Sequence, residues 1–445
     1  MRITVFICSI ILMLGSLPCL SQCECEEEKK YFKLLEQASD KKKYDLRKRI
    51  QFLENAQEID EDCPDAIMML GELYFKRAKS SPNISYRSAQ GYFEDLSSRC
   101  PEYHSDIHYY LGIIYYTQEN WTSALASFEQ FLDFSHSPSE KMVRNSQKKI
   151  ADVETVIEEV RFNAELFGNP VPFNPAKVNG VSGAWDEYLP MLSPDNENLF
   201  FTRKYNKKAK GDLYGREVEE FTASSREGVN SEFDSGKALP RPFNLGDNYG
   251  GASISVNNRE MYVTVCKPDA SGYTNCDIYV TRFSKTLDEK TGKEEYAWSE
   301  LKNLGGGVNT KDGWEAQPSL SADANTLYFA TARETSTENS EGGKSIDIYY
   351  SLRGKDGNWG KARSIGDVIN GPGNEKSPFM HGDSRTLYFS SDGLMGVGGY
   401  DIFYSRIEDD GQWSLPKNIG VPINTSEDEH GLIVSTDGSL AYYAS

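Results

Sequence analysis

A motif that recurs five times at a spacing near sixty residues constrains the fold of this chain more than any other feature. Each copy begins with Ser or His, passes through a short polar turn and ends in an apolar, mostly aromatic triplet. The copies begin at Ser193, Ser255, Ser321, His381 and Ser435, so the separations are 62, 66, 60 and 54 residues. Several short strands per repeat at this period are typical of small sheets arranged around a centre. The repeat therefore predicts an all-β unit of equivalent sheets.

Other positions recur within the same repeat. The first four copies continue into a strand expected to begin at Asp212, Asp277, Asp347 and Asp401. A Val-Asn or Ile-Asn pair precedes three copies, with its asparagine at Asn309, Asn370 and Asn424. Six residues before the Ser or His stand Glu187, Glu315, Glu375 and Glu429, with Tyr249 in the second copy. Short carboxylates and amides in turns bond nearby backbone N–H groups, and no loop carries the carboxylate series of a calcium site. We expect structural roles for the repeat carboxylates.

The fourth repeat contains a glycine-rich stretch, with Gly393, Gly396, Gly398 and Gly399. A loop that cradles phosphate would be followed by a helix N-terminus. Here the next residues are Tyr-Asp-Ile-Phe-Tyr, which favour a strand. We interpret the stretch as the link between two strands and assign it no phosphate.

The repeat core resembles the WD40-like, TolB-like β-propeller family of bacterial envelope proteins. The family pattern, SPDG-x-x-LYF-x-S-x-R followed by GG-x-DIY-x-S, is matched best at 381–406 and well at 321–351. The second copy departs from it, because it lacks the proline and has Asn257 in place of Asp. The resemblance implies a propeller at 169–445 with at least four full blades and a partial fifth. The blade units lie near 181–247, 248–308, 309–369, 370–423 and 424–445.

The last blade poses a closure problem. We expect residues 171–179 to supply its outer strand, because their composition is that of a fourth strand. The sequence stops two strands into the fifth unit, so we expect a C-terminally truncated chain. In the resembling architecture an OmpA-like peptidoglycan-binding domain commonly follows the propeller.

The N-terminal part has helical spacing instead. Leu111, Gly112, Tyr115, Ala124 and Phe128 match the tetratricopeptide pattern, and a second copy starts at Leu70. In this pattern small residues let two helices approach while aromatic side chains fill the groove between them. Residues 22–168 therefore resemble a short tetratricopeptide domain, which implies a concave surface for protein partners. The predicted fold class is a multidomain α + β protein, with a tetratricopeptide-like helical array followed by an all-β propeller.

Residues 1–21 have one early Arg, an apolar run and small residues at the end, which is the pattern of a secretory signal peptide. Cleavage between Ser21 and Gln22 is the favoured prediction. Lipid attachment at Cys23 is the less favoured alternative, because Gln22 is large for a lipoprotein signal. We expect no transmembrane segment in the mature chain and a location in the periplasm or on the periplasmic face of the outer membrane.

Six cysteines remain after the signal, an even number that suits an oxidising compartment. Cys266 and Cys276 are expected to form a disulfide within one blade. Cys63 and Cys100 precede equivalent prolines, and they pair either with each other or with Cys23 or Cys25. Zinc is the rival interpretation, but Cys23 and Cys25 are too close in sequence for ordinary ligand spacing. We predict no metal and no cofactor.

The formal net charge of −19 argues against nucleic acid and anionic lipid as partners. The chain has no G-x-S-x-G and no HExxH motif, so we predict that it is not an enzyme. The preferred function is an envelope scaffold that binds proteins through its helical groove and propeller loops. The resemblance implies a role in type IX secretion or in peptidoglycan-linked outer-membrane assembly, with peptidoglycan bound only through a missing C-terminal domain. A carbohydrate- or small-ligand-binding propeller is the alternative, and a hydrolase is the least favoured.

Overall fold

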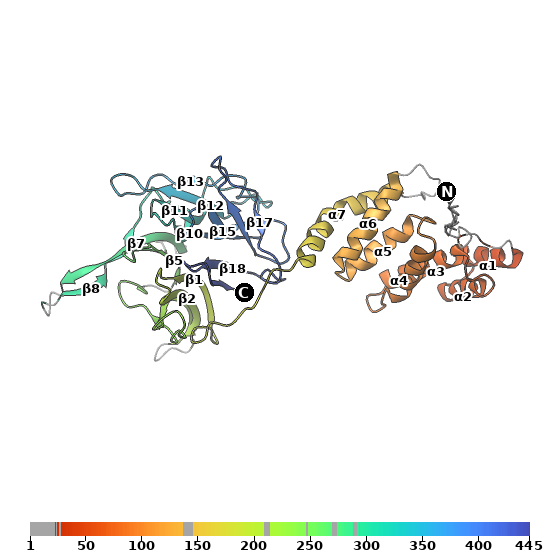
Figure 1. The fold of residues 1–445 in the computed structure, drawn as a ribbon, viewed down its shortest axis with the longest axis horizontal. Helices are drawn as coiled ribbons and strands as arrows, with labels where there is room; N and C mark the ends of the chain where they lie inside the picture. The colour runs from red at the N-terminus through yellow and green to blue at the C-terminus, as the bar shows by residue number, and fades with distance from the viewer. Residues whose placement is uncertain are drawn as a thin grey trace, which may run out of the picture. The chain divides into compact units, whose positions relative to one another are not determined.

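The computed structural model describes residues 23, 25, 28–136, 146–208, 214–245, 248–268, 274–287, 292 and 294–445. The chain divides into two compact units, Met1–Asn169 and Pro170–Ser445. The described part of the first unit is helical, and the second is built from sheets (Figure 1). The predicted order of helices followed by sheets is confirmed.

Seven helices make up the described part of the first unit. They are α1 (Lys29–Ser39), α2 (Leu46–Gln57), α3 (Pro64–Lys79), α4 (Arg87–Arg99), α5 (Asp106–Thr117), α6 (Trp121–His136) and α7 (Ser146–Gly168). Helices that follow one another in the chain pack together, for example α3 on α4 and α5 on α6. Their shared core is rich in aromatic side chains, including the fully buried Phe93 and the nearly buried Phe128.

Two glycines set how closely these helices approach. A Cβ atom on Gly71 would lie 2.6 Å from Cε1 of Phe93, and one on Gly112 would overlap the ring of Phe128. The aromatic rings therefore occupy the space that the missing side chains leave. This is the packing that the glycine and aromatic spacing predicts.

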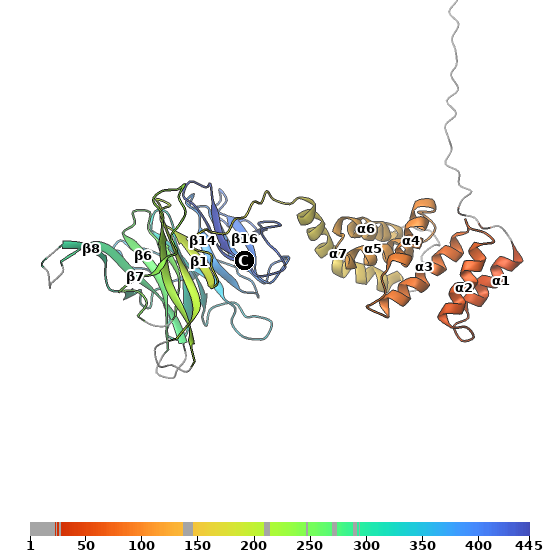
Figure 2. The same cartoon turned by 90° about the horizontal axis from the view of Figure 1, so that it is seen from below.

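The described part of the second unit contains one nine-stranded sheet, two four-stranded sheets and one two-stranded sheet. The nine-stranded sheet divides into two antiparallel groups of strands, so five groups follow one another along the chain, and they are called the first to the fifth sheet below. The first holds β1 (Asp186–Leu192), β2 (Asn198–Lys207), β3 (Arg216–Ser225) and β4 (Lys237–Ala238). The second holds β5 (Asn248–Ile254), β6 (Glu260–Pro268), β7 (Thr274–Leu287), β8 (Glu294–Trp298) and β9 (Lys302–Asn303). One parallel bridge, between Glu219 and Asn248, joins these two sheets. The β7–β8 hairpin extends beyond the sheets in both views (Figure 1, Figure 2).

The remaining sheets follow the same order. The third holds β10 (Trp314–Leu320), β11 (Thr326–Ala332), β12 (Asp347–Leu352) and β13 (Arg363–Ser364). The fourth holds β14 (Glu375–Met380), β15 (Thr386–Ser391), β16 (Asp401–Arg406) and β17 (Lys417–Asn418). The fifth has two strands, β18 (His430–Val434) and β19 (Ala441–Ala444).

The first repeat differs from the expected strand positions. Asp212, the expected start of its third strand, lies outside the described residues. The strand in that place is β3, which pairs with β2 from Lys207 opposite Arg216 to Asn198 opposite Ser225. Among the described residues, the third strand of the first sheet therefore begins at Arg216.

The first strands of the five sheets meet around a common centre. β1 contacts β5, β5 contacts β10, β10 contacts β14, β14 contacts β18, and β18 contacts β1. The contacts therefore form a closed ring, and each sheet extends outward from it. β1, β5, β10 and β18 lie near the middle of this unit in Figure 1.

The repeat's polar turns bond to their own backbone, as predicted. Ser321 Oγ donates to Asp323 Oδ1 at 2.6 Å, and the N–H of Thr326 donates to Ser321 Oγ at 2.9 Å. Ser435 and Asp437 repeat these bonds in the last copy. These side chains are therefore used to shape the turn between the first and second strands.

The side-chain amides of the recurring asparagines bond to a backbone N–H and a backbone carbonyl, as a neighbouring strand would. Asn370 Oδ1 accepts from the N–H of Ile348 at 2.9 Å, and its Nδ2 donates to the carbonyl of Ile348 at 2.9 Å. Asn309 and Asn424 make the same pair of bonds to Ile278 and Ile402. Because a buried backbone group without a partner is costly, these amides stabilise the start of each third strand.

The glycine-rich stretch links β15 to β16, as predicted. The N–H groups of Val397 and Gly398 donate to Asp401 Oδ2 at 2.8 and 3.1 Å. A Cβ atom on Gly398 would overlap the carbonyl oxygens of Thr425 and Glu427. Glycine is required here because the loop packs against the next link of the chain.

A pair of glycine substitutions tests the packing of the helical unit. Gly112→Ala should destabilise it by about 1–3 kcal/mol, because the added methyl group overlaps Phe128. Gly91→Ala, in α4 with no neighbour within 4 Å of a new Cβ, should stabilise it by about 0.5–1 kcal/mol. Urea unfolding followed by the helical circular dichroism signal measures both changes. Equal effects of the two variants would contradict close packing at Gly112.

Candidate functional site

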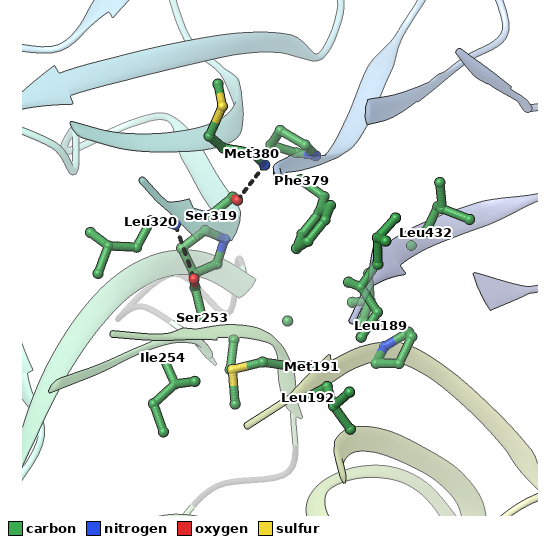
Figure 3. Close-up of a pocket in the computed structure, with 18 of the residues that line it drawn as sticks. Leu189, Met191, Leu192, Ser253, Ile254, Ser319, Leu320, Phe379, Met380 and Leu432 are labelled. Carbon is green, nitrogen blue, oxygen red and sulfur yellow. Dashed lines mark hydrogen bonds between the residues drawn. The ribbon is translucent and has the colours of Figure 1, made fainter. Parts of the chain in front are cut away.

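The five inner strands enclose a pocket of about 150 Å³. Each strand lines it with the segment that leads to the Ser or His of its repeat. Figure 3 shows Leu189, Met191, Ile254, Phe379 and Leu432 around the opening, with the Phe379 ring pointing towards its centre. The lining is mostly hydrophobic, with hydroxyl and amide groups among the apolar side chains.

The backbone at this pocket is irregular in all five strands. In each strand the pairing register shifts at one point. At that point lies a residue with positive φ, four residues before the repeat Ser or His. These residues are Leu189 (52°), Gly251 (63°), Gln317 (53°), Ser377 (50°) and Gly431 (70°). A non-glycine residue in this conformation costs on the order of 1–3 kcal/mol, so the surrounding ring must hold it.

Hydrogen bonds between neighbouring sheets hold these positions. The N–H of Ser377 donates to Gln317 Oε1 at 2.8 Å. The N–H of Leu320 donates to Ser253 Oγ at 2.9 Å, and that of Met380 donates to Ser319 Oγ at 2.8 Å (Figure 3). Each bond joins one inner strand to the next, so the irregular backbone is fixed from the adjacent sheet.

These central positions were not predicted from the sequence. Their constant spacing in sequence, four residues before the repeat Ser or His, could have indicated them. So was the proline that directly follows three of them, Pro190, Pro318 and Pro378.

The lining residues carry no titratable side chain. They offer hydrophobic surface, the hydroxyls of residues such as Ser253 and Ser319, and the amide of Gln317. Glycoside hydrolysis generally uses a pair of carboxyl groups, and this pocket does not supply one.

Carboxyl groups lie instead at the beginning of the inner strands. Glu315, Glu375 and Glu429 are fully buried. Glu315 accepts from the N–H of Thr310 at 2.8 Å and pairs with Arg333 at 3.0 Å. The predicted structural role of these glutamates fits this geometry, since each bonds the loop that precedes its strand.

Glu375 differs from Glu315 in its surroundings. It accepts from the N–H of Gly371 at 3.0 Å and from Ser391 Oγ at 2.8 Å. In the place of Arg333 the fourth repeat has Gly393, which has no charge to offer. Burial raises the pKa of Glu375 to about 7, against a smaller lowering by these hydrogen bonds.

A polar cluster accompanies Glu375 at this end of the ring. Lys376 Nζ lies 3.8 Å from the centroid of the Tyr400 ring, and the N–H of Tyr400 donates to Asp428 at 2.9 Å. Burial lowers the pKa of Lys376. Burial, followed by the nearby Lys376 charge, lowers the pKa of His430. Lys376 and His430 follow the repeat glutamate directly, where the other repeats have Tyr188, Gly250 and Ala316.

The six cysteines that the structure describes are joined in three pairs. Cys266 and Cys276 face each other on β6 and β7 and form a disulfide with an S–S distance of 2.03 Å. Cys63 and Cys100, for which the sequence left two pairings open, bond to Cys25 and Cys23 respectively. The two disulfides tie the N-terminal segment to the start of α3 and the end of α4.

These pairings bear on the lipid and metal hypotheses. The Cys23 sulfur is in a disulfide and is not free to carry a lipid. Within the described part, Cys25, Cys63 and Asp65 lie close enough to share a metal ion, but the disulfide uses both sulfurs. The cleavage site at Ser21 and Gln22 lies outside the described residues. None of the helices in the described part is both long and apolar enough to cross a membrane.

No known protein family and no curated protein matches this chain. Solved structures do. A thermostable family-43 glycoside hydrolase is 15% identical, with a TM-score of 0.38 over 60% of this chain and 86% of that one. A TolB candidate from Agrobacterium tumefaciens is 15% identical, with a TM-score of 0.29 over 59% and 91%. A glycosyl hydrolase from Bacteroides ovatus is 9% identical, with a TM-score of 0.36 over 62% and 92%. At such identities and scores, these matches carry no argument about ligand or reaction.

The matches nevertheless correct one prediction. The absence of known catalytic motifs led us to predict that the chain is not an enzyme. Several of the structures that match it are glycoside hydrolases, so this arrangement of sheets does not exclude catalysis. The prediction is wrong in treating missing motifs as sufficient, and it is withdrawn.

The raised pKa of Glu375 predicts a pH-dependent stability. The carboxyl group holds its proton up to about pH 7 when folded and releases it near pH 4.5 when unfolded. Glu375 therefore makes its full contribution to the free energy of unfolding below pH 4.5. That contribution falls by on the order of 3 kcal/mol as the pH rises through 7. Glu375→Gln should remove this loss.

Calorimetry between pH 4.5 and 8, on the transition of the β unit, measures the difference between wild type and variant. Glu341→Gln, at an exposed position of the same unit, is the matched control and should leave the pH dependence unchanged. A Glu375→Gln profile parallel to wild type would contradict the assignment.

Proposed function

We propose that this protein is an exported scaffold of the bacterial cell envelope, in the periplasm or on the periplasmic face of the outer membrane. Its first unit is a tetratricopeptide-like array and its second a five-bladed WD40-like β-propeller. The ring of five inner strands and the repeat pattern support the propeller. The three disulfides of the described part support an oxidising compartment.

The observation that carries the proposal is the central pocket. All five repeats converge on it, and its surface is hydrophobic without a titratable group. A hydrophobic side chain of a partner protein is the occupant that such a surface favours, because burial of apolar area stabilises the complex. Phe379, whose ring points into the opening, is the main contact that we assign to the partner.

Envelope proteins are the partners in this proposal, bound at the propeller loops and in the helical groove. The more specific proposal is a role in type IX secretion or in peptidoglycan-linked outer-membrane assembly. It rests on the resemblance of the repeat to the WD40-like, TolB-like family. Contact with peptidoglycan would require a further domain.

A second candidate is a carbohydrate or small polar ligand. The cluster of Lys376, Tyr400 and His430, near the start of β14 and β18, favours it, because it combines an aromatic ring with hydrogen-bonding groups. The two candidates use different side chains of the same ring, so substitutions can separate them.

Capture from an envelope fraction, quantified by mass spectrometry, tests the choice. Phe379→Asp should reduce capture of the main partner at least about tenfold, because it places a charge in a hydrophobic contact. Lys376→Ala should leave capture unchanged, and both variants must keep the wild-type thermal transition. The proposal fails if capture is insensitive to Phe379→Asp. Binding of an oligosaccharide that is lost in Lys376→Ala would support the second candidate instead.

A further inference from the structure

A run of positive charge lies where α1 ends and α2 begins. Residues 40–49, called the basic tip below, carry six cationic side chains and two carboxylates, which gives a formal charge of +4. The six cations are Lys41, Lys42, Lys43, Arg47, Lys48 and Arg49, and all but Arg49 are exposed. The net charge of the whole chain, −19, on which we based the expectation against anionic lipid, does not describe this surface.

The two carboxylates of the basic tip bond to its own backbone. Asp40 Oδ1 accepts from the N–H groups of Lys42 and Lys43, each at 3.1 Å. Asp45 Oδ1 accepts from the N–H of Lys48 at 2.8 Å and so caps α2. None of the ion pairs in the described helical unit involves the basic tip. Its cationic groups are therefore available to an anionic partner.

Hydrophobic side chains lie among these charges. Leu46, the first residue of α2, is 37% exposed. The rings of Tyr44 and Phe52 meet edge to face, with their centres 4.9 Å apart. Lys43 Nζ lies 5.2 Å from the centre of the Tyr44 ring, and Lys48 Nζ lies 5.3 Å from that of Phe52. The basic tip thus combines cations with an exposed leucine and an aromatic pair.

This combination favours a lipid surface over other anionic partners. Each cation near a surface of anionic headgroups strengthens binding by about fivefold. Leucine and aromatic side chains beside such cations enter the boundary between headgroups and acyl chains. Attraction to a nucleic acid or to a soluble acidic protein needs only the cations, so it gives no role to Leu46.

We propose that the basic tip is a peripheral membrane-binding surface, and that its partner is a bilayer carrying anionic phospholipids. The cationic side chains contact the headgroup phosphates, while Leu46 contacts the apolar boundary beneath them. The contact needs no helix that spans the bilayer. It depends neither on the central pocket nor on the partner proposed for that pocket, so the two can be tested separately.

Cosedimentation of the mature protein, residues 22–445, with lipid vesicles tests the proposal. Mixed vesicles of phosphatidylglycerol and phosphatidylcholine should bind the protein, whereas vesicles of phosphatidylcholine alone should not. The combined variant Lys41→Gln, Lys42→Gln and Lys43→Gln should bind the mixed vesicles at least about tenfold more weakly, because three attracting charges are lost. Leu46→Gln should bind about fivefold more weakly, because a hydrophobic contact is lost.

Three exposed lysines of the β unit provide the matched control. The combined variant Lys302→Gln, Lys355→Gln and Lys361→Gln makes the same change in charge and should bind the mixed vesicles as the wild type does. Thermal unfolding checks that every variant keeps the wild-type transition. The proposal is overturned if both kinds of vesicle bind equally, or if the two lysine variants bind equally. Binding by Leu46→Gln that equals the wild type would also overturn it, in favour of a soluble acidic partner.

Discussion

The five inner strands must close on themselves around one centre, and the rest of the β unit depends on that closure. Regular strands that converge on a point crowd one another, so each inner strand breaks its register where it comes nearest the centre. As a result Leu189, Gln317 and Ser377 have positive φ angles, which are unfavourable in free energy for residues other than glycine. Bonds such as that from the Ser377 N–H to Gln317 Oε1 come from the neighbouring strand, so no single sheet could hold this geometry alone.

The polar residues that recur in several repeats stabilise the β unit itself. Asn370 satisfies the backbone of Ile348, Asp323 shapes its turn, and Glu315 fixes the loop before β10. Residues that perform the same structural task in several repeats have little freedom to bind something else. Positions that differ between repeats are therefore the better candidates for function, and Phe379, Lys376 and His430 are such positions.

The helical unit depends on a different kind of fit. Gly71 and Gly112 let aromatic rings lie against a helix backbone, and hydrophobic contact between rings fills the interior. Two disulfides then hold the N-terminal segment against this array. Since such bonds restrict the unfolded chain, they stabilise the folded form of the helical unit.

The sequence by itself determined the order of helices and sheets, the strand pairs within each repeat and the turn roles of residues such as Asp323. These features rest on contacts between residues close in the chain, so spacing and side-chain type were enough to predict them. Only the tertiary structure decided how Cys23, Cys25, Cys63 and Cys100 pair, where the inner strands bend, and that Arg333 forms an ion pair with Glu315. It also decided that the central pocket is hydrophobic, because side chains from all five sheets meet there. Each of these depends on distances between residues far apart in the chain, which periodicity within one repeat does not fix.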